Sequence, residues 1–530
     1  MVINQLVKLF KNIRIAVASL IACFYLTHNA LAQNNTKPNV VVIFADDLGY
    51  GDLSCYGATK HKTPNIDRLA NEGRRFIDAH SASAVCTPSR YALITGEYPF
   101  RVNHGKGVWG PLPKNHKLIV DTSRITIGKI MQQQGYETAV IGKWHLGFGE
   151  TTPTDWNGTL KPGPLQLGFD YYFGVPFVNS GPPYVYVEND HVVGLEENDP
   201  LVHGGQPISE TQLYPDKSRN SFSGGTKAHA LYKDDEIGTT LAGKAVKWIN
   251  DQKDNPFFLY LATTNIHHPF SPHPRFKGTS ESGRYGDFVH ELDWIVGEVM
   301  KALKDAGVAD NTLVVFTSDN GGMLNVGGQE AWELGHKMNG ELLGFKFDGW
   351  EGGHRVPFIA RWPGKITPDS KSSQLLSNVD LLATMAALTG YELQENDAPD
   401  SYNMIPAFTE DPIQPIRNHL VISPFKRKNL VLRVGDWVYM GSKGGGGWNG
   451  GKPGSHILGG PAALRFAGEV NSDIEDGKLK PNAQEAQLYN LKSDVSQSTN
   501  VSEQESQRAN MMKEMLRIIQ LSDYTRDKKL

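Results

Sequence analysis

The stretch Asn39-Val40-Val41-Val42-Ile43-Phe44-Ala45-Asp46-Asp47 decides the fold class, because an unbroken apolar run stops at two adjacent acids. Such a run predicts a strand buried on both faces, as in a largely parallel sheet. Similar apolar runs lie at 138–141, 256–261, 312–316 and 356–360. Segments with helical spacing fall between them, at 63–70, 125–134, 240–250 and 288–306. Strands that alternate with helices predict an α/β sandwich with both sheet faces covered.

The character of the chain changes after about residue 400. Glycine runs at 444–447 and 450–451 indicate flexible loops, and 430–434 with 437–440 predict a hairpin across Gly435-Asp436. Residues 503–521 predict a terminal helix. We therefore expect a large α/β domain at 33–400 and a smaller α+β subdomain with an antiparallel sheet at 401–530.

The first 32 residues have the pattern of a cleavable signal peptide. A basic start with Lys8, Lys11 and Arg14 precedes an apolar run at 15–26, and Ala30-Leu31-Ala32 is a small-residue cleavage site. The apolar run is too short for a stable membrane span. The pattern predicts a secreted or periplasmic protein. Cys23 offers a lipoprotein alternative, which the apolar residues that follow it disfavour.

Bulk composition excludes some function classes. With 39% hydrophobic and 21% charged residues the chain is typical of soluble globular proteins. Loss of the signal peptide removes three positive charges and no acid, so the net charge goes from −4 to −7. A mildly acidic protein is a poor nucleic-acid binder, so no nucleic-acid partner is expected. Besides Cys23, only Cys55 and Cys86 are present, too few for a disulfide framework.

Chemically active residues lie beside every predicted strand. They are Asp46-Asp47 after the first, Lys143-Trp144-His145 after the second, His267-His268-Pro269 after the third, Asp319-Asn320 after the fourth, and Lys346 with residues 350–355 before the fifth. In a parallel sheet functional residues gather at the carboxyl ends of the strands. These clusters are therefore expected to meet at one edge of the sheet.

The residue types in these clusters point to ester hydrolysis. Asp46, Asp47, Asp319 and Asn320 are oxygen donors that suit Ca²⁺ or Mg²⁺ better than zinc. The cations that can hold a tetrahedral oxyanion are Lys143, Lys346 and Arg90. The histidines that can move protons near neutral pH are His145 and His267. A metal, an oxyanion clamp and acid–base groups together predict hydrolysis of a phosphate or sulfate ester.

The segment Cys86-Thr87-Pro88-Ser89-Arg90 offers a candidate nucleophile, although a cysteine at a helix start can also occur by chance. Thr87 as cap and Pro88 at the first helical position would place Cys86 just outside a positive helix end. Cys-x-Pro-x-Arg followed by Leu-x-Thr-Gly at 93–96 resembles the signature of the type I, formylglycine-dependent sulfatases, which are arylsulfatase-like members of the alkaline phosphatase superfamily. The other clusters match that family in order, and the resemblance spans residues 38 to 400.

The resemblance implies an alkaline-phosphatase-like fold, one bound Ca²⁺, and oxidation of Cys86 to formylglycine by a maturation enzyme. Asp46, Asp47, Asp319 and Asn320 would hold the metal together with residue 86. Arg90 would steady the hydrated aldehyde, while Lys143 and Lys346 would bind sulfate oxygens. One hydroxyl of the hydrate attacks sulfur, and His267 protonates the leaving alcohol. His145 then deprotonates the second hydroxyl, which reforms the carbonyl and expels sulfate.

Two other functions remain open at this point: a phosphoric or phosphonic ester hydrolase of the same fold, and an inactive sugar-binding homologue. Export and the family resemblance imply a sulfated carbohydrate as substrate, a polysaccharide or glycosaminoglycan. Aromatic residues at 182–186 and the loop at 104–109 are candidates for contact with sugar faces.

Overall fold

A computed structural model describes residues 37–113, 115–204 and 222–526. The predicted signal peptide, its cleavage site and Cys23 lie outside these residues. Within the described ranges, no helix is both long enough and apolar enough to cross a bilayer.

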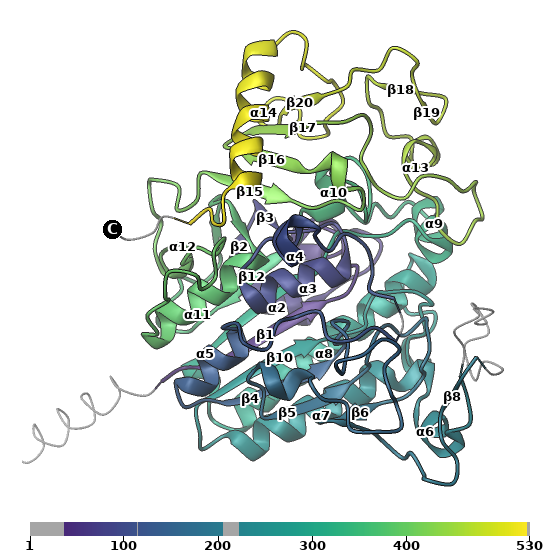
Figure 1. Ribbon diagram of the computed structural model, residues 1–530, viewed down its shortest axis with the longest axis vertical. Helices are drawn as coiled ribbons and strands as arrows, with labels where there is room; N and C mark the ends of the chain where they lie inside the picture. Colours follow the sequence, from purple (N-terminus) through teal and green to yellow (C-terminus); the bar gives the residue numbers. More distant parts are fainter. Residues whose placement is uncertain (1–36, 114, 205–221, 527–530) are drawn as a thin grey trace, which may run out of the picture.

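A ten-stranded sheet forms the centre of the molecule (Figure 1), in the order β13-β2-β12-β11-β1-β10-β4-β5-β6-β7. Neighbouring strands are parallel throughout its middle, which consists of β11 (Thr312–Ser318), β1 (Asn39–Ala45), β10 (Phe257–Ala262), β4 (Glu137–Gly142) and β5 (Tyr171–Gly174). The predicted largely parallel sheet is therefore confirmed, and four of its five middle strands coincide with the apolar runs.

The fifth apolar run forms β12 (Phe358–Arg361), which is antiparallel to β11. The start of β12 therefore lies at the edge where the parallel strands end. Residues that precede β12, such as Lys346, lie at the same sheet edge as residues that follow the parallel strands. The strands beyond it are β2 (Arg74–Phe76) and β13 (Ser370–Ser372), and the opposite edge is formed by β6 (Val187–Glu188) and β7 (His191–Val192).

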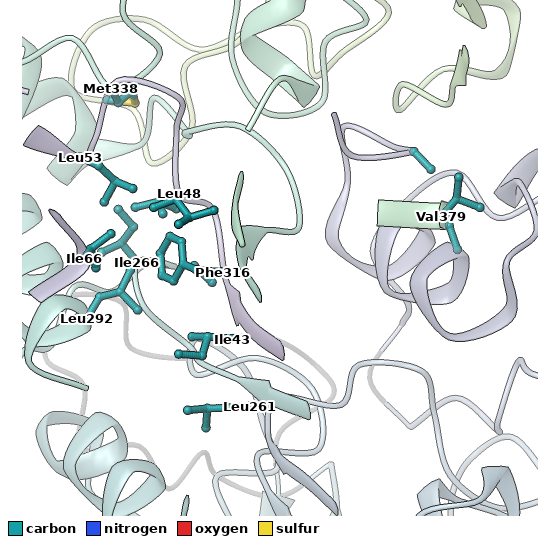
Figure 2. Close-up of a cluster of buried hydrophobic side chains, with 14 of the residues drawn as sticks. Ile43, Leu48, Leu53, Ile66, Leu261, Ile266, Leu292, Phe316, Met338 and Val379 are labelled. Carbon is teal, nitrogen blue, oxygen red and sulfur yellow. The ribbon is translucent and has the colours of Figure 1, made fainter. Parts of the chain in front are cut away.

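Alternate residues of β1 face two separate hydrophobic layers. Val41 and Ile43 contact the layer built by α2 (Pro64–Asn71), α7 (Ile237–Gln252) and α8 (Gly283–Asp305). Figure 2 shows this layer, with Ile66 of α2 near Leu292 of α8, and Ile43 of β1 between Phe316 and Leu261. Val40, Val42 and Phe44 face the layer of α3 (Cys86–Thr95), α5 (Ile127–Gln133) and α11 (Leu381–Thr389). The period of two in a strand explains why every side chain of β1 is buried.

A second sheet, antiparallel and of four strands, lies toward the C-terminus (Figure 1). Its strands are β15 (His419–Ile422), β16 (Val431–Val434), β17 (Trp437–Met440) and β20 (Gln487–Asn490), in that order. The predicted hairpin is present as β16 and β17, joined through Gly435 with φ of 55°. The predicted terminal helix is α14 (Ser506–Leu521), in which Arg508 lies over the Trp437 ring. The boundary at residue 400 stays a prediction.

Short elements complete the described chain. The remaining helices are α4 (Val102–Gly105), α6 (Thr226–Leu231), α9 (Val326–Glu333), α10 (Glu351–His354), α12 (Ile405–Thr409) and α13 (Pro461–Ala467). The remaining strands are β3 (Ala79–His80), β14 (Leu376–Ser377), β8 (Val202–His203), β9 (Phe222–Ser223), β18 (Ile474–Glu475) and β19 (Lys478–Leu479).

Candidate active site

Cys86 is the first residue of α3, so the helix begins two residues earlier than the sequence predicts. The cap is Val85, with extended backbone, and Thr87 does not cap the helix. The Thr87 hydroxyl instead accepts a hydrogen bond from the Leu112 amide (2.9 Å) and lies 3.3 Å from the His145 carbonyl, to which it donates. The Thr87 hydroxyl is therefore hydrogen-bonded to residues distant in sequence, whereas the local pattern predicts that it caps the helix. Cys86 itself is buried, and burial raises the pKa of its thiol.

Four oxygen-bearing side chains meet at the ends of β1 and β11. Asp46 and Asp47 follow β1, Asp319 and Asn320 follow β11, and all four are buried. Carboxylate oxygens of the three aspartates lie within 4.8 Å of one another. Asp47 has φ of 62°, and its backbone amide donates to Asp319 Oδ1 at 3.1 Å. A non-glycine residue in the left-handed region costs free energy, and such strain concentrates at functional sites.

The same four residues fit a hard cation. Asn320 Nδ2 donates to Asp47 Oδ1 and to the Gly321 carbonyl, both at 2.9 Å. Asn320 Oδ1 and Asp47 Oδ2 are buried and have no hydrogen-bond partner. A buried acceptor without a partner is costly. A divalent cation with oxygen ligands would satisfy both atoms, and the donor set has the chemistry that Ca²⁺ prefers.

Three buried cations surround the carboxylates. Arg90 bonds Asp319 Oδ2 through Nη2 (2.7 Å) and Nε (3.1 Å). Lys143 Nζ lies 2.9 and 2.7 Å from the two oxygens of Asp46, and Lys346 Nζ bonds Asp47 Oδ1. Burial lowers the pKa of Lys346, but Asp47 and the other carboxylates outweigh it and hold that pKa above its usual value. The result is a rigid set of positive groups at the sheet edge, suited to an oxyanion.

The two predicted histidines lie at the ends of neighbouring strands. His267 Nδ1 is 2.8 Å from the His268 carbonyl and 3.1 Å from Asn179 Oδ1, so this nitrogen carries the proton. Its other nitrogen, Nε2, lies 3.9 Å from Asp47 Oδ2. His145 has φ of 57°, and its Nδ1 has no hydrogen-bond partner. Burial, reinforced by Lys143, holds the pKa of His145 well below its usual value, so its imidazole is neutral.

A family model described as Sulfatase matches residues 38–391, which include every site residue described above. The chain belongs to the sulfatase family. This sulfatase is therefore a sulfuric ester hydrolase, as the motif at Cys86 indicated, and the inactive sugar-binding reading is set aside.

Related proteins agree with this assignment. The sulfatase is 38% identical over 525 residues to an N-acetylgalactosamine-6-O-sulfatase of Bacteroides thetaiotaomicron, covering 94% of this chain and 96% of the relative. It is 34% identical over 386 residues to the human N-acetylgalactosamine-6-sulfatase, covering 70% of this chain and 66% of that one. A solved structure described under the metabolism of multiple glycosaminoglycans by Bacteroides thetaiotaomicron has 35% identity and a TM-score of 0.80, covering 92% and 100% of the two chains.

For the alternative function, a phosphoric or phosphonic ester hydrolase, the similarity extends to the fold alone. A phosphonate monoester hydrolase of Agrobacterium radiobacter has a TM-score of 0.53 at 18% identity, covering 91% of this chain and 95% of that one. Such a likeness places both chains in one architecture and carries no activity from one to the other.

Two features of this sulfatase differ from the sequence-based prediction. Asn179 was not predicted as a site residue, and the loop at 182–186 was assigned a role in sugar contact. Asn179 holds His267 from the loop after β5, where no motif marks it. The rings of Tyr184 and Tyr186 in that loop were candidates for sugar contact, and this was wrong. Both are buried against Tyr232, with ring centroids 5.8 and 5.3 Å apart. In the other candidate loop, Trp109 is half-buried and donates to the Lys106 carbonyl.

Proposed function

We propose that this sulfatase removes the 6-O-sulfate from N-acetylgalactosamine residues of a sulfated glycosaminoglycan. One observation carries the proposal: the 38% identity to the Bacteroides N-acetylgalactosamine-6-O-sulfatase extends over 94% of this chain and 96% of the relative. Identity over that length includes most of the C-terminal region, which borders the site. The human relative with the same sugar and position in its name supports the same substrate class.

Asp46, Asp47, Asp319 and Asn320 are proposed to hold one Ca²⁺ together with residue 86. Support comes from the two partnerless oxygens in this set and from its all-oxygen chemistry. Cys86 is proposed to be converted to formylglycine by a maturation enzyme, as its sequence motif implies. Metal and hydrated aldehyde together supply an activated hydroxyl nucleophile at position 86.

Lys143 and Lys346 are proposed to bind the sulfate group, and Arg90 is proposed to steady the hydrated aldehyde at residue 86. Lys143, Lys346 and Arg90 keep N–H donors beyond those that contact Asp46, Asp47 and Asp319, because an ammonium has three and a guanidinium five. Charge-assisted hydrogen bonds from fixed donors also stabilise the charge that develops on sulfate oxygens during transfer. Their positions are held by carboxylates, so little reorganisation is needed when substrate binds.

The two histidines are proposed to divide the proton transfers. His267 keeps Nδ1–H on the His268 carbonyl and Asn179, which aims Nε2 toward the cluster to protonate the leaving oxygen. Burial holds the pKa of His267 well below its usual value. A bound sulfate ester brings negative charge, which favours the protonated imidazole. His145, neutral and with a free Nδ1, is proposed to take the proton from residue 86 when sulfate is released.

Export is part of the proposal. A signal peptide at residues 1–32 would deliver the enzyme to the periplasm or medium, where glycosaminoglycan fragments are available. We propose the divisions at 33–400 and 401–530 as catalytic domain and C-terminal subdomain. The second sheet, with its own strands and helix, supports this division.

A panel of defined substrates tests the assignment. Sulfate release is measured from N-acetylgalactosamine 6-sulfate, its 4-sulfate isomer, N-acetylglucosamine 6-sulfate and nitrophenyl sulfate, with nitrophenyl phosphate as the test for phosphatase activity. The first compound should have the highest kcat/KM, and Cys86→Ala should abolish every rate. Preference for the 4-sulfate, or turnover of nitrophenyl sulfate with none of any sulfated sugar, would contradict the proposal.

A further inference from the structure

A glycine-rich segment between β17 and α13, here called the rim loop (residues 441–460), borders the site (Figure 1). At one end the Gly349 amide donates to the Gly445 carbonyl at 2.6 Å. At the other end the Leu458 amide donates to the Leu324 carbonyl at 3.0 Å. The loop thus rests on the two segments that carry Lys346 and Asn320.

The sequence predicts flexible loops at 444–447 and 450–451. In the first of these runs, three glycines lie close against other side chains, whereas a Cβ added at Gly450 would meet nothing. A Cβ added at Gly447 would lie 2.2 Å from Asp348 Oδ1, and one at Gly445 would lie 2.6 Å from the same atom. Gly446 has φ of 71°, and a Cβ added there would lie 2.3 Å from Asn429 Cβ. The glycine run therefore lets the backbone approach the buried Asp348 closely and holds the loop in one place.

The loop presents one exposed indole beside the nucleophile. Phe347, next to Lys346, lies in one hydrophobic cluster with Cys86, and Phe425 packs against that cluster. Trp448 contacts both rings, with centroids 6.4 Å from Phe347 and 5.9 Å from Phe425, yet remains 44% exposed. Two backing rings fix the indole and leave part of it open. A rigid, partly exposed aromatic beside a polar site is a typical recognition surface.

The same loop also reaches the proposed acid. His456 packs edge-on against His268 at 4.7 Å between centroids, and His268 stacks on His267 at 4.2 Å. The rim loop therefore flanks the reaction centre on the side of Lys346 and on the side of His267.

We propose that the rim loop forms a second sugar subsite, in which Trp448 stacks on the pyranose ring next to the one that carries the reacting sulfate. Phe347 belongs to the same cluster as Cys86, and Trp448 packs on the Phe347 ring, so this ring links the indole to the nucleophile. The apolar face of a pyranose matches the exposed indole. This inference rests on the proposed glycan substrate and adds to it a preference for substrates with more than one sugar.

The test compares substrates of two lengths in the full-length enzyme. Rates are measured for Trp448→Ala and Trp448→Phe on N-acetylgalactosamine 6-sulfate and on a chondroitin 6-sulfate tetrasaccharide. Trp448→Ala should lower kcat/KM for the tetrasaccharide on the order of tenfold more than for the monosaccharide, mainly through KM. Trp448→Phe should recover part of that loss. Leu334→Ala removes a side chain of equal exposure, 44%, outside the site and should change neither rate.

Binding separates recognition from catalysis. Calorimetry with Cys86→Ala should give a Kd for the tetrasaccharide that rises on the order of tenfold when Trp448→Ala is added. Equal losses on both substrates, or no loss on the tetrasaccharide, would overturn the subsite. If the wild type releases sulfate from nitrophenyl sulfate but from neither sugar, the proposed function fails instead, so the two failures are distinct.

Discussion

Replacing His267 by alanine should slow hydrolysis of a sulfated sugar far more than hydrolysis of nitrophenyl sulfate. In the structure His267 directs Nε2 toward the carboxylate cluster, because its other nitrogen is held by the His268 carbonyl and Asn179. A sugar alkoxide is a poor leaving group and needs the proton, whereas nitrophenolate leaves with little help. General acid catalysis contributes about 10²–10⁴-fold, or roughly 2.7–5.5 kcal/mol.

Substitution of Asn179, which contacts His267, should weaken the same step to a smaller extent. Asn179→Ala removes one of two acceptors of the Nδ1 proton, and the His268 carbonyl remains at 2.8 Å. One neutral hydrogen bond is worth about 0.5–1.5 kcal/mol. The loss on the sugar should therefore be about 2- to 13-fold. It should share the substrate selectivity of His267→Ala, because Asn179 orients the imidazole whose Nε2 is proposed to protonate the leaving oxygen.

Single-turnover and steady-state rates on both substrates give the answer. His145→Ala is the comparison, because its proposed role concerns release of sulfate from residue 86, a step common to both substrates. Its defect should appear as a burst followed by slow turnover whatever the leaving group. If His267→Ala loses the same factor on both substrates while chemistry is rate-limiting, His267 is not the acid. A larger loss for Asn179→Ala than for His267→Ala would refute the geometric reasoning.

Three further predictions concern the nucleophile, the metal and a buried acid. Mass spectrometry of the peptide that contains Cys86 should show formylglycine in active enzyme, and an active preparation with only a thiol there would exclude this chemistry. Chelation should abolish turnover and Ca²⁺ should restore it, because the buried atoms Asp47 Oδ2 and Asn320 Oδ1 have no hydrogen-bond partner in the protein; full activity after verified metal removal would contradict the site. Asp348 is buried and burial raises its pKa to about 7. Since the folded state then favours the protonated acid, stability should fall as pH rises from about 4 to 7, by at most about 4 kcal/mol. Asp348→Asn should flatten that part of the curve in thermal unfolding, and parallel curves for both proteins would count against it.

Long buried strands were predictable because both of their faces are apolar. The runs that became β1, β10 and β11 have this character in the sequence itself. Strands of two residues, such as β6 and β7, have no pattern of their own and form only because a neighbour offers its backbone groups. The reversed direction of β12 was also unreadable, since an apolar run carries no information on orientation.

Predictions from neighbouring residues were wrong where a residue distant in sequence contacts the segment. Thr87 has the position of a helix cap, but the Leu112 amide and the His145 carbonyl use its hydroxyl. The glycines at 444–447 predict a flexible loop, but the backbone at Gly445 and Gly447 lies so close to Asp348 that a Cβ at either position would collide with it. In both cases the deciding atom comes from a segment far away in the chain, which a pattern over neighbouring residues cannot represent.

The sequence by itself determined the reaction centre, because its members stand directly beside strands whose ends must converge at one edge of a parallel sheet. Asp46, Lys143, His267 and Asp319 are therefore brought together by topology, before any detail of packing. Tertiary structure alone decided what surrounds that centre. Asn179 reaches His267 across 88 positions, and Trp448 reaches Phe347 from the connection between β17 and β20 of the second sheet. Such contacts depend on how loops pack over the finished sheet edge, and no periodicity in the chain encodes them.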